Sequence, residues 1–397
     1  MKLKKQIEKL AAFEPNGTKF ISLYLDAQAN QNGRDEYSTW LKTQFYEYSV
    51  QFENDTQKAR KYAEIQERVN NYLANDTDGS ANGIAVFAEV EDEGLFETVQ
   101  LDEAFPNNRF FVFDRPHIFP LVRIVEQNPQ YAVLWADTNK ADIYIFGGES
   151  ALNAELQTEA KVEEIQNEIT NRSQVGGWSQ ARYQRHVENF HLQHAKETVE
   201  ELEKLMREKK VEHLVLCGDE TGVMPILRPQ LSKVTEEKVI AVINLSQYAS
   251  EHEIREQTSA AIGIVNVKRD KEKVERAIGA TKAAAGLGTL GVEETLAALS
   301  NGQVEELVVS ANFDAIRYNL KEVEKVLKDY APGDDNSASD ELPEAREKRQ
   351  IGDELIIRAL NSDARIIFIE DDSLLKDVGG VGAVLRYNMN ATANGNQ

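Results

Sequence analysis

Cysteine is nearly absent from this chain, because Cys217 is the only one among 397 residues. A single thiol excludes an intrachain disulfide and a zinc site built from several thiolates. Cationic side chains are also scarce: 45 Lys and Arg stand against 67 Asp and Glu, for a formal net charge of −22. Such a chain does not coat nucleic acid with a basic surface, so contact with RNA would need one concentrated basic patch.

Long hydrophobic runs are missing as well. No run approaches the roughly 20 apolar residues of a membrane span, and residues 1–8 turn amphipathic without the apolar segment of a signal peptide. We therefore expect a cytoplasmic protein that does not enter the membrane. Hydrophobic residues make up 41% of the chain, which is enough for packed cores, and the length predicts two or three domains.

The patterns predict an α/β and α+β multidomain protein with three domains, at residues 1–128, 129–266 and 267–397. β-branched and aromatic runs bounded by turn residues predict the strands, and apolar residues at three- and four-residue steps predict the helices. In the first domain we expect strands at 20–26, 83–90, 95–101 and 109–113, and a helical region at 37–74 with a break near Asn54 and Asp55. In the second we expect a hairpin of 132–136 with 141–146, a long helix at 181–210, and strands at 211–217 and 239–245. In the third we expect helices at 271–285, 291–299 and 344–360, strands at 304–310 and 364–370, and a flexible insert near 331–343.

The segment Gly176-Gly177-Trp178-Ser179-Gln180 is the most informative part of the chain. Two adjacent glycines allow backbone shapes that other residues refuse and let N–H groups approach a ligand closely. From position 171 to 187 the charged residues are Arg172, Arg182 and Arg185, with no carboxylate. A locally cationic tip at the start of a long helix is the patch that an acidic chain would need to reach RNA. The alternative is an ordinary helix-entry turn with Ser179 as the N-cap.

Other motifs favour structural roles. Residues 286–291 match G-x-G-x-x-G, but a helix precedes them where a dinucleotide site needs a strand, so we expect a loop before the next helix. His186, His191 and His194 share the long helix without a third metal ligand, so we expect solvated or partly packed histidines. Cys217 ends an apolar strand and is expected to be a buried structural thiol. We expect no metal and no cofactor.

Three separated features resemble the archaeal and eukaryotic class-1 peptide-chain release factors, and the chain looks like their bacterial branch. Residues 176–185 are similar to the region around that family's Gly-Gly-Gln motif, with its following Arg-aromatic-x-Arg cluster. Residues 214–218 look like its strand-and-glycine segment. Residues 291–309, and the helix and strand before 380–387, are similar to its C-terminal domain.

The resemblance implies a central RNase H-like domain and a C-terminal domain like the kink-turn-binding ribosomal proteins. In relatives the central loop enters the peptidyl-transferase centre of the large ribosomal subunit, where water attacks the ester of peptidyl-tRNA. The C-terminal domain commonly docks a translational GTPase. The resemblance thus implies the ribosome and peptidyl-tRNA as partners, and motivates a translational GTPase as a third.

The departures from the family pattern leave the activity open. Trp178 occupies the position of the family glutamine, whereas Gln180 gives a Gly-x-x-Gln spacing similar to that of Vms-type relatives, which act on tRNA in stalled large subunits. As implied roles, Gly176, Gly177 and Gln180 would form the catalytic set. Trp178 and the three arginines (Arg172, Arg182 and Arg185) would contact RNA.

The family's two stop-codon elements, Asn-Ile-Lys-Ser and Tyr-x-Cys-x-x-x-Phe, are missing. Codon reading is therefore not expected. Three hypotheses lead: a rescue-type factor that hydrolyses the peptidyl-tRNA ester, a non-enzymatic A-site factor of the Pelota or hibernation kind, and a Vms-type factor that cleaves the tRNA 3′ end. A protein unrelated to translation is the residual alternative.

Overall fold

The computed structural model describes eleven stretches of the chain: residues 2–28, 37–50, 56–79, 81–101, 103–137, 140–147, 161–162, 177–246, 249–283, 285–327 and 343–388. The chain forms two compact units. One joins residues 1–128 (the N-terminal segment) to residues 267–397 (the C-terminal segment), and the other is the central unit of residues 129–266. The predicted α/β and α+β multidomain class is confirmed, while the predicted insert near 331–343 lies almost wholly outside the described residues.

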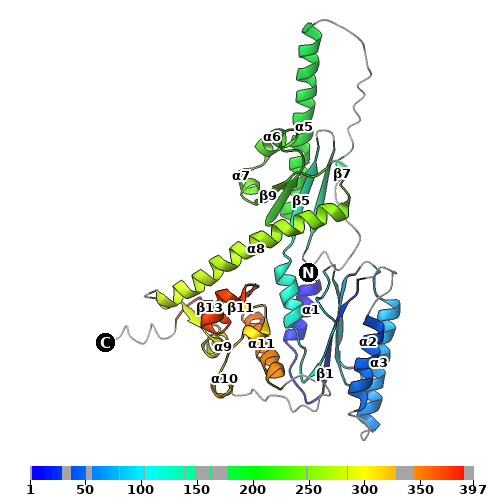
Figure 1. Ribbon diagram of the computed structural model, residues 1–397, viewed down its shortest axis with the longest axis vertical. Coiled ribbons are helices and arrows are strands. Elements are labelled where there is room, and N and C mark those ends of the chain that lie inside the picture. Colours follow the sequence, from blue (N-terminus) through cyan, green and yellow to red (C-terminus); the bar gives the residue numbers. More distant parts are fainter. Residues whose placement is uncertain are drawn as a thin grey trace. The chain divides into compact units, whose positions relative to one another are not determined.

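The N-terminal segment is built on an antiparallel sheet in the order β3-β2-β1-β4. Its strands are β1 (Phe20–Asp26), β2 (Gly83–Glu89), β3 (Phe96–Leu101) and β4 (Arg109–Phe113), and its first helices are α1 (Lys2–Ala11), α2 (Tyr37–Ser49) and α3 (Thr56–Asn75). Alternate residues of β1, such as Ile21 and Leu23, pack against Phe45 and Tyr62 of α2 and α3, which lie together along the sheet in Figure 1. The predicted helical region at 37–74 is thus two helices.

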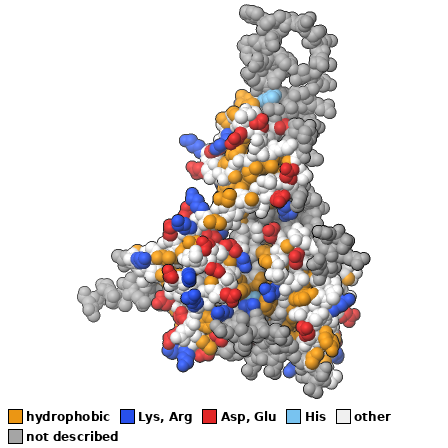
Figure 2. All heavy atoms as spheres, viewed as in Figure 1, with side chains coloured by type: hydrophobic (Ala, Val, Ile, Leu, Met, Phe, Trp, Pro, Cys, Tyr) orange, Lys and Arg blue, Asp and Glu red, His pale blue; other side chains and the backbone are white. Residues whose placement is uncertain are grey.

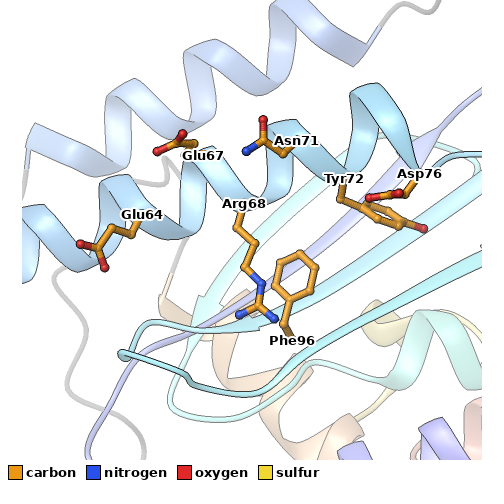
Figure 3. Close-up of a pocket in the computed structure, with 7 residues that line it drawn as sticks. All are labelled: Glu64, Glu67, Arg68, Asn71, Tyr72, Asp76 and Phe96. Atoms are coloured by element: carbon orange, nitrogen blue, oxygen red, sulfur yellow. The ribbon is translucent and has the colours of Figure 1, made fainter.

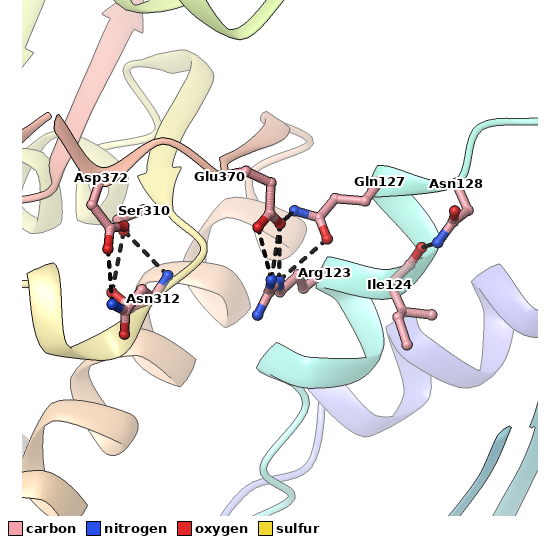
Figure 4. A network of polar contacts seen from close by, with 8 residues as sticks. All are labelled: Arg123, Ile124, Gln127, Asn128, Ser310, Asn312, Glu370 and Asp372. Carbon is pink, nitrogen blue, oxygen red and sulfur yellow. Dashed lines mark hydrogen bonds and ion pairs between the residues drawn. The ribbon is translucent and has the colours of Figure 1, made fainter. Parts of the chain in front are cut away.

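A helix that the sequence analysis missed ends the N-terminal segment. α4 (Phe119–Gln127) carries a proline in its first turn, where the absent N–H costs no hydrogen bond. Arg123 of α4 binds Glu370 of the C-terminal segment at 2.9 Å, and Gln127 donates to the same carboxylate (Figure 4). Contacts of this kind make one unit of two segments that are far apart in the sequence.

The central unit holds a mixed sheet in the order β7-β6-β5-β8-β9. Its strands are β5 (Tyr131–Ala136), β6 (Ala141–Phe146), β7 (Lys161–Val162), β8 (His213–Cys217) and β9 (Val239–Ile243), and its helices are α5 (Gly177–Lys209), α6 (Met224–Leu227), η3 (Arg228–Gln230), α7 (Lys233–Glu236) and the start of α8 (Glu251–Lys282). β5 and β6 form the predicted antiparallel hairpin, and β5, β8 and β9 run parallel.

Helices cover the two faces of the central sheet. Leu134 and Leu216 face α5 with its Leu202, whereas Trp135 and Cys217 belong to the opposite cluster with Ile254 of α8. Side chains alternate between faces along a strand, so this buried sheet reads as continuous apolar runs in the sequence.

Gly218 closes β8 at a place where no side chain fits. Its φ is +155°, and a Cβ there would lie 2.3 Å from the carbonyl oxygen of Ala136. The glycine therefore lets β8 leave the sheet directly beside the end of β5.

The C-terminal segment is built on a sheet in the order β10-β13-β11-β12. Its strands are β10 (Gly288–Leu290), β11 (Val304–Ser310), β12 (Arg365–Ile369) and β13 (Val381–Leu385). After the end of α8 come α9 (Val292–Ser300), η4 (Phe313–Ala315), α10 (Leu320–Val326), α11 (Pro343–Asn361), η5 (Asp372–Leu374) and η6 (Lys376–Val378). β11 and β12 are parallel, and β13 is antiparallel to β11.

Two predictions in this region were wrong in part. The G-x-G-x-x-G segment is not wholly a loop, because Gly288–Leu290 pairs with β13 as an edge strand. The helix expected from 271 begins at Glu251. Its apolar residues serve different cores, with Ile254 in the central unit and Val274 under the C-terminal sheet, so no single stripe marks the helix. Within the described part of the chain, no helix has the length and apolarity needed to span a membrane.

Candidate functional site

The predicted site lies at the start of α5. This helix begins at Gly177, four residues before the predicted start at Ala181. Trp178, Ser179 and Gln180 therefore belong to its first turn, and the reading of Ser179 as the N-cap was wrong. A two-glycine run has little intrinsic helix propensity, which is why the sequence pattern placed the boundary later. Arg172 and Gly176 lie outside the described residues.

Only the backbone is described for the other predicted site residues, Trp178, Gln180, Arg182 and Arg185. An α-helix turns by about 100° per residue. Positions 178, 182 and 185 therefore fall on one stripe of α5, while position 180 lies about 200° around the axis from position 178. The site residues thus divide by position into an aromatic and cationic stripe and a glutamine on the other side of the helix.

The second half of α5 anchors the helix to its sheet. Its buried residues are His194, Ala195, Thr198, Val199, Leu202, Leu205 and Met206. Among the residues whose side chains are described, His194 is the first of these, and 17 helical steps, or about 25 Å at 1.5 Å per residue, separate it from Gly177. Figure 1 shows the first part of α5 running on past the strands and short helices of the central unit. The backbone of α5 thus extends about 25 Å along the helix axis from His194 to its start at Gly177.

The electrostatics at the beginning of α5 favour an anion. The first turn contains no acidic residue, and the sequence contains no carboxylate between Gly177 and Val187. The first four N–H groups of a helix have no intrahelical partner, and the helix dipole adds partial positive charge there. With Arg182 and Arg185 in the next turns, this end of α5 combines backbone donors with cations, which suits a phosphate or a developing oxyanion.

On the drawn face, by contrast, acidic and basic side chains are interspersed over the described surface (Figure 2). The chain as a whole is acidic, with a net charge of −22, but the start of α5 contains arginines and no carboxylate. Because phosphate contacts require concentrated cations, the exception matters more than the total charge.

The histidines of α5 differ in burial. His194 is 3% exposed, and burial lowers its pKa, with nearby Asp137 acting in the opposite direction. His191 is half-buried, and only the backbone of His186 is described. Among the described residues, no three His, Cys, Asp or Glu side chains come together to hold a metal ion.

Cys217 is buried, as predicted. Burial raises the pKa of its thiol to about 12. A thiolate nucleophile requires a lowered pKa, so this residue is a structural one.

One hollow in the N-terminal segment escaped the sequence analysis. It has a volume of about 450 Å³ and lies between α3 and β3 (Figure 3); its lining consists of Glu64, Glu67, Arg68, Asn71, Tyr72, Asp76 and Phe96. The Arg68 guanidinium lies 4.1 Å from the Phe96 ring centroid. Its residues come from a helix and a strand some 20 positions apart, so no local motif marks it.

Several carboxylates of the acidic stretch at positions 89–97 are paired. Glu91 pairs with Lys61, and Glu97 binds Lys9 at 2.5 Å. Glu89 accepts hydrogen bonds from Asn16 and from the Leu95 N–H, and the pKa of its carboxyl is lowered by these bonds against the opposing effect of burial. These carboxylates therefore have structural partners within the N-terminal segment.

Two family models match the chain. The model described as "Bacterial archaeo-eukaryotic release factor family 10" matches residues 116–262, and "eRF1 domain 3" matches residues 267–389. The chain belongs to the bacterial branch of the archaeal and eukaryotic release-factor superfamily. The first match contains all of α5, and residues 1–115 lie outside both matches.

Individual relatives agree with this membership. Peptide chain release factor subunit 1 of Thermococcus kodakarensis is 24% identical over 426 residues, which cover 97% of each chain. Eukaryotic peptide chain release factor subunit 1 of Saccharomyces cerevisiae is 31% identical over 169 residues, 38% of each chain. Among solved structures, Archaeoglobus fulgidus Pelota is 13% identical over 77% of this chain and 79% of its own, with a TM-score of 0.32. The two family models and the sequence relatives make the chain a release-factor-like protein of translation.

Proposed function

We propose that this protein is a ribosome-associated rescue-type factor that hydrolyses the peptidyl-tRNA ester without reading a stop codon. The observation that carries the proposal is the carboxylate-free start of α5, with Gly177 at its first position and about 25 Å of helix between it and the buried His194. Membership of the release-factor superfamily supports the same assignment.

In this proposal the end of α5 enters the peptidyl-transferase centre of the large subunit. Gly176 and Gly177 permit close approach of the backbone to RNA. Free N–H groups of the first turn bind the oxyanion that forms when water attacks the ester carbonyl, an interaction that supplies several kcal/mol in other acyl-transfer sites. The Gln180 amide positions the water, while Arg172, Arg182 and Arg185 neutralise RNA phosphates.

Peptide release from purified ribosomes that carry labelled peptidyl-tRNA tests the hydrolytic step. Wild type should release peptide with any codon, or none, in the A site. Gln180→Ala should lower the release rate at least about tenfold, because the amide acts only in the transition state. Gln184→Ala, one helical turn further along, is the matched control and should retain the rate. Equal inertness of wild type and Gln180→Ala on both stalled ribosomes and isolated large subunits would contradict hydrolysis.

The second candidate is a non-enzymatic factor that occupies the A site. Trp178 favours it, because an indole stands where the family has its amide and a flat ring can stack on a nucleotide. The positions of Trp178, Arg182 and Arg185 on one stripe of α5 fit such a role. Co-sedimentation with ribosomes that requires Trp178 but is not accompanied by peptide release selects this candidate.

The Gly-x-x-Gln spacing of Gly177 to Gln180 supports cleavage of the tRNA 3′ end as the further alternative. The length of the tRNA product separates the two reactions, because ester hydrolysis leaves the RNA intact and nuclease action shortens it. The same reaction mixtures therefore distinguish all three candidates.

A translational GTPase is proposed as a partner of the C-terminal segment, whose residues 267–389 match the third domain of the release factors. Immobilised protein is expected to retain one purified bacterial translational GTPase in its GTP-bound state. Failure to retain any of them in any nucleotide state would remove this partner from the proposal.

A further inference from the structure

The N-terminus of α4 is capped by a residue from another part of the chain. Its own N-cap position, Ile118, offers no side-chain hydrogen bond. Instead, Oδ1 of Asp353, on α11, accepts from the backbone N–H groups of Ile118 and Phe119, both at 3.0 Å. A carboxylate at this place satisfies two free donors and is stabilised by the helix dipole. The start of α4 thus depends on a side chain that lies 235 positions later in the sequence.

The second oxygen of Asp353 reaches His117, and His117 is fixed to the N-terminal sheet. His117 Nδ1 lies 2.5 Å from Asp353 Oδ2, and the two side chains are 0% and 1% exposed. The His117 N–H donates to Ser22 Oγ at 2.9 Å, and its carbonyl accepts from the Tyr24 hydroxyl. One carboxylate therefore links β1, the start of α4 and α11.

The protonation state follows from the surroundings. His117 Nε2 is buried and has no hydrogen-bond partner among the described residues, while the rings of Tyr24, Phe111, Phe113 and Phe313 surround the imidazole. A second N–H on that ring would be buried without an acceptor, at a cost. A neutral His117 that donates from Nδ1 to an ionised Asp353 satisfies the geometry, and Asp353 then carries the charge of the network.

The packing around this network is close. Phe119 of α4 lies 4.1 Å, centroid to centroid, from Phe313 of the C-terminal segment. A Cβ on Gly352 would lie 2.8 Å from the Phe313 ring, so the glycine beside Asp353 is what lets α11 approach. At the rim, Arg115 binds Glu354 at 2.7 Å and Arg123 binds Glu370 at 2.9 Å. The contact thus has a buried centre at the Asp353 carboxylate, with the Arg349 guanidinium over the nearby Phe111 and Phe313 rings, and a more exposed ionic rim.

We propose that Asp353 is a latch: its charge holds the N-terminal segment on the C-terminal segment, and the two segments separate when that charge is removed. In the separated state water hydrates the α4 N–H groups and His117. In the docked state Asp353 is the acceptor of the two α4 N–H groups and the partner of His117 Nδ1 among the described residues, so an uncharged side chain leaves buried donors poorly paired and favours separation. Interfaces within a chain that contain several polar and charged contacts resemble transient protein–protein interfaces, and they allow the two sides to separate.

Single-molecule energy transfer on the full chain tests the latch. Dyes are attached at Asn70→Cys on α3 and Glu324→Cys on α10, both exposed positions, while buried Cys217 stays unlabelled. The labelled protein with Asp353 intact should give one narrow distribution of distances between the two dyes. Asp353→Asn, which keeps the shape and removes the charge, should raise the fraction at longer distance at least about tenfold. Asp377→Asn, an exposed carboxylate of the same segment, is the matched control and should leave the distribution unchanged.

A second variant protects the test against misfolding. Arg115→Gln with Arg123→Gln removes the two rim ion pairs and leaves the buried centre intact, so it should raise the separated fraction by a smaller factor. Circular dichroism of wild-type intensity identifies the folded variants. The latch is overturned if folded Asp353→Asn keeps the wild-type distribution. Should Asp353→Asn fail to fold, an unchanged distribution in the rim variant overturns it instead.

Discussion

The hydroxyl of Thr198 is expected to destabilise the protein, so its removal should raise stability. Thr198 lies on α5, is 1% exposed, and its Oγ1 is buried without a hydrogen-bond partner among the described residues. A buried polar group in this condition costs about 1–3 kcal/mol. Valine has nearly the same shape, is also β-branched and has a similar helix propensity. We therefore expect Thr198→Val to raise the free energy of unfolding of the central unit by about 1 kcal/mol.

Thr258 provides the matched control in the same unit. It is 0% exposed, and its hydroxyl donates to the Ile254 carbonyl at 2.7 Å and lies 3.2 Å from the Tyr131 hydroxyl. Thr258→Val should lower the free energy of unfolding by about 1 kcal/mol, because bonds to buried partners are lost. The same chemical change is thus predicted to have opposite signs at two buried sites.

Urea unfolding followed by the fluorescence of Trp135 measures both changes. The chain has three tryptophans, so Trp40→Phe with Trp178→Phe leaves Trp135, which is 4% exposed, as the single reporter of the central unit. An increase of about 1 kcal/mol corresponds to a rise of roughly 2–4 °C in the thermal midpoint for a unit of this size. If Thr198→Val lowers the free energy of unfolding as Thr258→Val does, the reasoning from an unpaired hydroxyl is refuted.

Three further predictions concern the thiol, the arginines and a glycine. The pKa of Cys217 is about 12 in the native protein and about 8.5 when unfolded. The contribution of the protonated Cys217 thiol to the free energy of unfolding is therefore complete below pH about 8.5 and is lost as the pH rises toward 12. Cys217→Ala should show a flatter decline of the urea midpoint over that pH range. Arg182→Gln and Arg185→Gln should each weaken ribosome binding and reduce its salt slope by about one, as filter binding at several salt concentrations measures, whereas an unchanged slope would exclude phosphate contact. Gly218→Ala should cost more than about 2 kcal/mol in the same urea assay, because its Cβ would meet the Ala136 carbonyl; a neutral effect would mean that β8 shifts freely.

Much of the fold follows from local patterns. The strands of the central sheet are continuous apolar runs, and the structure has β5, β6 and β8 within two residues of the predicted limits. The buried side chains of α5 from His194 to Met206 recur at the predicted helical steps. These elements were predictable because burial on a sheet face or helix stripe imposes a fixed period on the sequence.

Other elements have no local signal. α4 holds a proline in its first turn and is capped by Asp353 from a distant helix, so the feature that stabilises its start is absent from its own sequence. β10 is a strand because β13 lies beside it, although its glycines favour a loop. The candidate site divides in the same way. Its composition at positions 171–187 is a property of the sequence, whereas the start of the helix at Gly177 appeared only in the fold.

By itself the sequence determined the mixed α/β class, the apolar strands and stripes, and the local lack of carboxylates that sets one segment apart in an acidic protein. These are properties of residues that are close in the sequence, because burial on one face imposes a regular spacing of apolar residues and local charge depends on composition alone. Tertiary structure alone decided that Asp353 meets His117 and the start of α4, that residues 1–128 join residues 267–397, and that the Thr198 hydroxyl is buried with no hydrogen-bond partner in the described part of the chain. These features depend on which groups, distant in the sequence, are buried together. A buried polar atom destabilises the fold unless it is hydrogen-bonded.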